Sequence, residues 1–292
     1  AAMSNHMVNE ASPIADTRLE DGSRVSIVLP PVAINGPIIT IRKFFNKPIT
    51  IDRLIELESI TPEAAQFLEK LVKSKYNIFI SGGTGSGKTT FLNVLSDYVP
   101  DDERVITIED SAELQLHNIN NIVRLEARVA NSEGTNAVSI RDLIKASLRM
   151  RPDRIVVGEV RGPEAIDMLQ AMNTGHDGSL STGHANSPKD MLTRLETMVL
   201  MGMDMPVSAI RAQISSAIDI IVHLARLRDK SRKVVQIAEV GNCINGEIAL
   251  TPLFKFVENS QDKNGKVIGT LVRQNNVFNR TEKLEAAGFS EW

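Results

Sequence analysis

The 292-residue sequence has one cysteine, one tryptophan and no hydrophobic run long enough to cross a bilayer. Cys243 has no second cysteine to pair with, which excludes an internal disulfide, and no stretch resembles a secretory signal peptide. Aromatic residues make up only 4% of the chain and the net charge is -3, so stacking residues and a global positive charge are both missing. These absences predict a soluble protein of the reducing cytoplasm, with no transmembrane segment and no direct nucleic-acid partner.

The composition that is present is that of a folded, globular chain. Hydrophobic residues make up 42% and charged residues 24% of the sequence, which is close to the norm for such proteins and argues against disorder. The length suits one large hydrophobic core or two modest ones. We therefore expect one or two domains.

The N-terminal part of the chain predicts a small piece of sheet. Residues 24–29 and 38–44 are β-branched and alternating, and the turn between them is rich in proline and glycine. A sheet of this size cannot bury its own apolar face. We therefore expect residues 1–45 to form a partial, truncated N-terminal domain.

A connecting segment and a second domain follow. Residues 46–61 are predicted to be a linker that contains a short helix at 51–58. Thr61 followed by Pro62 is typical of an N-cap with proline at the first helical position. The second domain is therefore predicted to span residues 62–292.

Strands and helices alternate through most of this second domain, which predicts an α/β fold with a mainly parallel sheet covered on both faces. The predicted strands lie at 77–81, 104–108, 122–125, 154–157 and 178–182, and the predicted helices at 62–73, 88–97, 139–149, 163–173, 188–201 and 207–217. Over residues 223–292 the pattern changes, and we expect a β-rich C-terminal appendage with strands at 223–227, 233–240 and 247–256.

The segment from Gly82 to Thr89 matches the phosphate-loop pattern G-x-x-x-x-G-K-[ST]. It follows an apolar strand and opens a helix, where glycines let backbone N–H groups converge on a phosphate. Lys88 is expected to reach the β- and γ-phosphates of ATP, and the Thr89 hydroxyl to bind Mg²⁺. A flexible glycine turn without a ligand is the alternative. The predicted nucleotide contacts are Gly82, Gly83, Thr84, Gly85, Ser86, Gly87, Lys88, Thr89 and Thr90.

A carboxylate ends the predicted strand at 154–157. Glu159 lies where a P-loop enzyme places the acid that polarises the attacking water, so we predict that it is the general base. Gly158, just before it, stands where many such enzymes carry aspartate. The residues alone leave open that Glu159 merely caps or solvates the end of a strand.

A second acidic group follows the strand at 104–108. Glu109, Asp110 and Glu113 come at the carboxyl end of a predicted parallel strand, which in open α/β sheets faces the ligand crevice. Acids also gather at helix N-termini because of the helix dipole, and that alternative stays open.

Two histidines frame the loop and strand at 177–183. Neither His176 nor His184 has a cysteine or histidine at a usual metal-binding spacing, so a zinc site is not expected. His184, together with Thr182, is placed to hydrogen-bond the γ-phosphate. The residues alone allow each histidine to be purely structural.

Together these segments resemble the secretion and pilus-assembly traffic ATPases, the hexameric RecA-like motors of type II and type IV secretion and of type IV pili. The resemblance spans nearly the whole chain and rests on four boxes in the family's order: GGTGSGKTT, ITIEDSAEL, RPDRIVVGEVRGPEA and TGHDGSLSTGHAN. The stretches DGSRVSIVLPPVAINGPIITIRKF and RLRDKSRKVVQIAEV look most like the tight-adherence (Flp) pilus assembly ATPases, the CpaF-like branch. In this family, glycine before the catalytic glutamate is the usual form.

The resemblance implies a RecA-like P-loop domain preceded by a partial PAS-like α+β domain. Position by position, it implies catalytic roles for Glu159, Glu113, His184, Arg24 and Arg42, and magnesium contacts from Thr89, Glu109 and Asp110. The two arginines would approach the γ-phosphate from the N-terminal domain and stabilise charge in the transition state. The residues alone also allow that both are exposed arginines of a strand with no catalytic role.

The resemblance further implies ATP hydrolysis with Mg²⁺ by a homohexameric ring. The ring would lie at the inner face of the cytoplasmic membrane and act on a polytopic platform protein, to assemble an Flp-type pilus or to drive type II or IV secretion. Residues 46–51 would absorb the rotation of domain closure. Two alternatives stay open: a type IV secretion or conjugation ATPase, and a slow, nucleotide-gated assembly protein. A DNA-dependent RecA-like enzyme fits the charge poorly, and a metabolic kinase has no evident use for the acid and histidine boxes.

Overall fold

The computed structural model describes residues 8–43, 48–128 and 137–289. The chain divides into two compact units, Ala1–Pro48 and Ile49–Trp292, each of which is described by itself.

The first unit contains a three-stranded antiparallel sheet in the order β1-β2-β3. Its strands are β1 (Ile14–Arg18), β2 (Arg24–Val28) and β3 (Ile38–Arg42). The sequence predicted the second and third strands, whereas β1 is short and carries Asp16 and Thr17, which weaken the apolar alternation. The described part of the unit is therefore a small sheet, as expected.

The second unit is built on a nine-stranded sheet in the order β12-β11-β10-β9-β4-β8-β7-β5-β6. Strand β4 pairs in parallel with β8 and β9, and β7, β5 and β6 continue the parallel half. The predicted α/β fold with a mainly parallel sheet is confirmed. The strands of this half are β4 (Ile78–Gly82), β5 (Arg104–Glu109), β6 (Asn121–Glu126), β7 (Arg154–Val157), β8 (Leu180–His184) and β9 (Ile220–Arg226).

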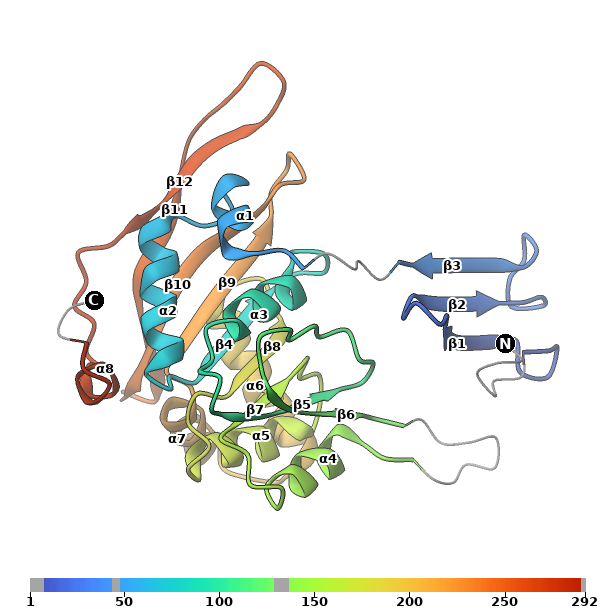
Figure 1. The fold of residues 1–292 in the computed structure, drawn as a ribbon, viewed down its shortest axis with the longest axis horizontal. Coiled ribbons are helices and arrows are strands. Elements are labelled where there is room, and N and C mark those ends of the chain that lie inside the picture. Colours follow the sequence, from blue (N-terminus) through green and yellow to red (C-terminus); the bar gives the residue numbers. More distant parts are fainter. Residues whose placement is uncertain (1–7, 44–47, 129–136, 290–292) are drawn as a thin grey trace. The chain divides into compact units, whose positions relative to one another are not determined.

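The C-terminal strands extend the same sheet. Strands β10 (Arg232–Ile244), β11 (Glu247–Gln261) and β12 (Val267–Arg273) pair antiparallel, starting from β9. The predicted β-rich region is therefore present, and its first strand starts at Ile220 as a parallel neighbour of β4. The C-terminal strands thus lie close in the sheet to the strand that precedes the phosphate loop (Figure 1).

The helices follow the predicted periodicity closely. Thr61 caps the second helix, because its side chain accepts a hydrogen bond from the N–H of Ala64, and Pro62 opens the first turn. The helices are α1 (Ile51–Glu56), α2 (Pro62–Lys73), α3 (Lys88–Ser96), α4 (Ile140–Ser147), α5 (Glu164–Asn173), α6 (Pro188–Gly202), α7 (Val207–Ala217) and α8 (Glu282–Ala286). In the described part of the chain, the search for a helix long and apolar enough to span a membrane found none.

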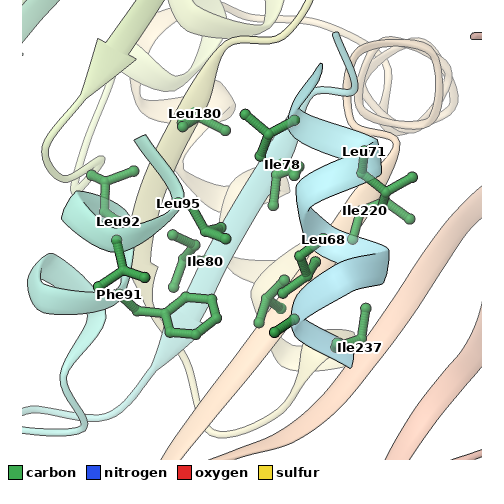
Figure 2. Packing of buried hydrophobic residues seen from close by; sticks show 14 of the residues in the cluster. Leu68, Leu71, Ile78, Ile80, Phe91, Leu92, Leu95, Leu180, Ile220 and Ile237 are labelled. Carbon is green, nitrogen blue, oxygen red and sulfur yellow. The ribbon is translucent and has the colours of Figure 1, made fainter. Parts of the chain in front are cut away.

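Helices cover both faces of the sheet and bury two hydrophobic clusters. Ile78 and Ile80 of β4 pack against α2 and α3 on one face, as Figure 2 shows, whereas Phe79 joins the cluster formed by α4 to α7. This alternation is the period-two pattern of a strand buried on both sides. Burial of β4 on both faces gives the loop at its carboxyl end a firmly packed base.

Candidate active site

The phosphate loop leaves the sheet at Gly82, the last residue of β4. A Cβ atom at this position would lie 2.4 Å from the carbonyl oxygen of Leu224 in β9 and 2.6 Å from Oγ of Ser86. Both distances are shorter than real Cβ contacts, so the neighbouring strand and the loop can approach this point only because it is glycine. The first glycine of the motif is thus required by packing.

The start of α3 offers backbone donors to an anion. Gly87 is the N-cap at φ 97°, and among the described residues no side chain caps this helix and no acid lies in its first turn. The first N–H groups of a helix and its dipole favour negative charge. The loop and the helix start therefore fit a phosphate group.

Lys88 lies over this loop. Its Nζ donates hydrogen bonds to the carbonyl oxygens of Gly82 and Gly83, at 3.1 and 3.0 Å. Burial lowers the pKa of the Lys88 ammonium, and the negative charge of Glu159 opposes that shift. The lysine is therefore aimed at the loop that it is predicted to serve.

Glu159, His184 and Lys88 form a chain of contacts that joins the segment after β7, the end of β8 and the start of α3. His184 Nε2 lies 2.6 Å from Glu159 Oε1, and His184 Nδ1 lies 3.4 Å from Lys88 Nζ. A neutral imidazole with its proton on Nε2 suits both neighbours, because Nδ1 can then accept from the ammonium. Burial is the main cause that lowers the pKa of His184; the negative charge of Glu159 opposes this shift, and the positive charges of Lys88 and Arg161 add to it.

Arg161 connects Glu159 to the acid box. One of its guanidinium nitrogens lies 2.5 Å from Oε2 of Glu159, and another lies 3.4 Å from Oδ2 of Asp110. The hydrogen bond with Glu159 raises the pKa of Arg161 above its ordinary value. Arg161 therefore bridges the carboxylates of Glu159 and Asp110.

Glu109 ends β5 and turns into its own loop. Its Oε1 accepts hydrogen bonds from the N–H groups of Glu113 and Leu114, at 2.8 and 2.9 Å, and burial raises the pKa of its carboxyl. A Cβ atom at Gly158 would lie 2.9 Å from Cγ of Glu109. The glycine that replaces aspartate therefore makes room for Glu109, which holds the acid-box loop in place. The magnesium contact of Glu109 stays a prediction.

The donor set for magnesium is small. Among the described residues, no group of three or more histidine, cysteine or acidic side chains is placed to hold a metal ion. A magnesium ion that is bound mainly by phosphate oxygens and water needs only one or two protein ligands. The predicted candidates are Thr89, in the first turn of α3, Glu109 and the exposed Asp110.

Other predicted residues lie at different positions. Arg24 and Arg42 face each other in the register of β2 and β3, in the first unit, and their approach to the γ-phosphate stays a prediction. Of the predicted hinge at 46–51, residues 46 and 47 lie outside the described residues. His176 Nδ1 lies 3.2 Å from the carbonyl oxygen of Ala171, a contact that fits a structural role.

Two further contacts at the site were not predicted. Thr182 Oγ1 donates to the carbonyl oxygen of Gly158 at 2.7 Å and so ties β8 to the end of β7. Arg232 Nε donates to the carbonyl oxygen of Gly85 in the phosphate loop at 2.8 Å. Arg232 lies 147 residues from Gly85 in the sequence, so only the fold brings the two together.

The fold and the site define a RecA-like P-loop protein with a carboxylate and a histidine beside its phosphate loop. The chain belongs to the family described as "Type II/IV secretion system protein", whose model matches residues 1–277. The predicted resemblance to the secretion ATPase superfamily is thereby confirmed, whereas the CpaF-like branch stays a prediction.

Individual relatives agree with this assignment. The type IV secretion system protein PtlH of Bordetella pertussis is 37% identical over 252 residues, which cover 77% of this chain and 74% of that protein. The conjugal transfer protein TrbB of Rhizobium radiobacter is 36% identical over 223 residues, 75% of this chain and 65% of TrbB. The crystal structure of the VirB11 ATPase from the Brucella suis type IV secretion system, in complex with sulphate, is 29% identical with a TM-score of 0.56, and the match covers 82% of this chain and 80% of that one. The family model and this solved structure thus agree with the secretion ATPase superfamily that the sequence predicted.

Proposed function

We propose that the chain hydrolyses ATP with Mg²⁺ and that Glu159 is the general base. The observation that carries this proposal is the continuous contact from Lys88 through His184 to Glu159, at 3.4 and 2.6 Å. It joins the residue expected to hold the phosphates to the carboxylate expected to activate water. A structural acid at the end of a strand would not need this connection to the phosphate loop.

Different residues of the chain hold the phosphates, orient the base and hold the magnesium ion in this proposal. Lys88 exchanges its contacts with Gly82 and Gly83 for phosphate oxygens, and the first N–H groups of α3 bind the same phosphates. Arg161 contacts Oε2 of Glu159 and so fixes the orientation of the carboxylate that takes the proton of the attacking water. A magnesium ion held by Thr89 and Asp110 would neutralise charge on the β- and γ-phosphates.

Phosphate release by a Glu159→Gln variant tests this assignment. The amide keeps the shape but cannot accept the proton, so we expect turnover to fall by about 10²-fold or more while ATP binding changes little. Glu247→Gln is a matched control, because Glu247 is an exposed carboxylate in β11 whose partner, Lys189, is exposed as well. Unchanged turnover in Glu159→Gln would refute the base. Normal ATP binding with no turnover in the unaltered protein would instead favour the nucleotide-gated assembly protein.

We further propose that the chain works as one subunit of a homohexameric motor at the inner face of the cytoplasmic membrane, on a polytopic platform protein. The family resemblance supports this role, and Arg24, Arg42 and Glu113 would complete the catalytic set. Assembly of an Flp-type pilus and type II or IV secretion both fit, and the named relatives suit the alternative of a type IV secretion or conjugation ATPase equally well.

Mass measurement with a non-hydrolysable ATP analogue tests the ring, and a monomer at every concentration would count against it. Capture of the membrane partner from native cells separates a pilus platform from a conjugation channel. Strong stimulation of turnover by DNA would instead point to a DNA-dependent enzyme.

A further inference from the structure

Arg232, the first residue of β10, contacts the phosphate loop at two points. Its Nε donates to the carbonyl oxygen of Gly85 at 2.8 Å. Its aliphatic stem lies over Gly87, where an added Cβ atom would come within 3.3 Å of Arg232 Cδ. A single side chain from the C-terminal strands therefore covers the loop from outside.

The contact with Gly85 also orients a backbone donor. In a trans peptide the C=O and N–H groups point in opposite directions, so holding the Gly85 carbonyl fixes the direction of the Ser86 N–H. That N–H points across the loop, to the carbonyl oxygen of Gly83 at 3.3 Å. Arg232 therefore helps to set the direction of an amide that belongs to the predicted phosphate cradle.

The same stretch of β10 holds the turn that follows α1. Ser59 Oγ donates to the carbonyl oxygen of Arg232 at 2.8 Å, and the N–H of Val234 donates to the carbonyl oxygen of Ser59, also at 2.8 Å. Lys233, between them, is only 2% exposed, and its Nζ donates to the carbonyl oxygen of Glu58 at 2.8 Å. Three consecutive residues of β10 thus hold the turn at residues 57–60.

The attachment of this turn is stiff because of Lys233. A buried ammonium without partners is costly, so the turn cannot leave β10 without stranding that charge. Helix α1 is the first helix of the second unit, and it follows directly after the segment that connects to the first unit. A displacement of β10 at Arg232 is therefore passed to the turn at the C-terminal end of α1.

We propose that Arg232 is a positioning residue that couples the phosphate loop to the turn at 57–60. Binding of a nucleotide moves the Gly85–Ser86 peptide, and Arg232 moves with it. The turn at 57–60, at the C-terminal end of α1, then shifts as well. The inference rests on the proposed nucleotide binding and adds a route from that site to the turn that ends α1.

Hydrogen exchange on the full chain tests the coupling. In the unaltered protein, a non-hydrolysable ATP analogue with Mg²⁺ should slow amide exchange both at residues 83–88 and at residues 57–60. In Arg232→Gln the loop should still be protected, while the response at 57–60 is lost. The KM for ATP should rise about tenfold, as expected for one charge-assisted hydrogen bond, with kcat changed less. Arg232→Lys should restore part of both effects.

Two further variants make the experiment specific. Arg228→Gln removes an arginine that precedes β10 and pairs with Glu258, so it should behave as the unaltered protein does. Ser59→Ala breaks the coupling at its other end, so the turn should lose its response while the KM stays the same. It also keeps the test decisive if Arg232→Gln is poorly folded.

The outcomes separate the two proposals. A protected loop with equal responses at 57–60 in the unaltered protein, Arg232→Gln and Ser59→Ala would overturn the coupling alone. A protected loop without any response at 57–60 in the unaltered protein would do the same. Absence of protection at 83–88 in the unaltered protein would overturn the proposed nucleotide binding and the coupling with it.

Discussion

Single atoms decide how the acidic side chains at this site are arranged. The carboxylate of Glu109 is buried at the end of β5 because Gly158, which directly follows the neighbouring β7, has no Cβ atom to displace it. Once there, it holds two backbone N–H groups of the acid-box loop. A residue to which the family resemblance assigns a magnesium contact thus holds backbone N–H groups of its own loop.

Gly158→Ala should disturb this arrangement. The added Cβ atom would come within 2.9 Å of Glu109 Cγ and push the carboxylate off the loop. We expect the free energy of unfolding to fall by about 1–3 kcal/mol, as in other overpacked sites, and turnover to fall with it. Urea denaturation and phosphate release measure the two effects. In a double-mutant cycle with Glu109→Ala, the two losses should be less than additive, and strict additivity would contradict the contact.

His223 should make stability depend on pH. Its ring is buried with Nδ1 2.7 Å from Ser81 Oγ, and burial is the main cause that lowers its pKa, with Asp190 opposing and Lys88 adding to the shift. Below the ordinary histidine pKa of about 6.5, the unfolded chain takes up a proton that the folded chain resists. The free energy of unfolding should therefore fall as the pH drops from about 7 to about 5.5, by at most about 1.4 kcal/mol per pH unit.

Urea titrations at several pH values measure this slope, and His223→Asn should flatten it. His184, whose pKa is also lowered, adds a smaller slope of the same sign because a third of its side chain is exposed. An equal slope in His223→Asn would show that other groups cause the pH dependence.

The site residues that the sequence could identify are those with distinctive local patterns. Lys88, Glu159 and His184 each stand in a motif, and the structure brings all three into contact. The inward turn of Glu109 depends on space at a neighbouring strand, and the contact of Arg232 depends on the sheet order. Neither leaves a local signal, because both are made by segments far apart in the sequence.

Helix caps fix where the elements around the site begin. Ser187 lies three residues after His184 and caps α6, with its side chain accepting from the N–H of Asp190 at 3.0 Å. Asp190 in turn accepts from the N–H of Asn186 at 2.8 Å. The chain therefore turns sharply from the end of β8 into α6, which keeps His184 at the carboxyl end of β8.

Ser187→Ala should loosen this turn. Loss of an N-cap side chain typically lowers the free energy of unfolding by about 1 kcal/mol. Thr193→Ala, further along the same helix and exposed, should cost less and serves as the control. Denaturant unfolding of both variants measures the difference, and equal stabilities would argue against the cap.

The sequence pattern predicted most of the elements, whereas β1, β12 and α8 were missed. Helix α8 has five residues, too few for a periodic signal. Strand β12 is interrupted by Gly269, where a Cβ atom would lie 2.5 Å from the carbonyl oxygen of Val257. The position of β9 beside β4 could not be predicted either, because strand order is set by contacts between distant segments.

The C-terminal residues form ion pairs and hydrogen bonds at the amino end of β9, the end of the strand that lies away from the phosphate loop. Arg280 and Lys283 pair with the buried Asp219, at 2.7 and 2.9 Å, and Lys283 also pairs with Asp177 at 2.7 Å. The N–H groups of Asn279 and Arg280 donate to the buried carboxylate of Glu239. Two buried acids therefore depend on residues that follow 277, where the match to the family model ends.

Removal of residues 278–292 should therefore destabilise the chain strongly. It removes these partners of Asp219 and Glu239 together with the buried side chains of Phe278 and Leu284, and loss of one partner of a buried ion pair alone costs about 3–5 kcal/mol. Thermal and denaturant unfolding measure the loss. Asp219→Asn in the shortened chain should recover part of it, because an amide carries no charge. A shortened chain as stable as the full one would show that these pairs contribute little.

The hydrogen bonds from Lys88 to the carbonyl oxygens of Gly82 and Gly83 affect how its variants are interpreted. Lys88→Ala removes an expected phosphate contact and, at the same time, two internal hydrogen bonds that support the loop. A protein altered in this way can lose ATP because its loop has rearranged, even if the lost charge matters little. Its unfolding without nucleotide therefore has to be compared with that of the unaltered protein. Only then can a loss of ATP affinity be attributed to the missing lysine–phosphate contact.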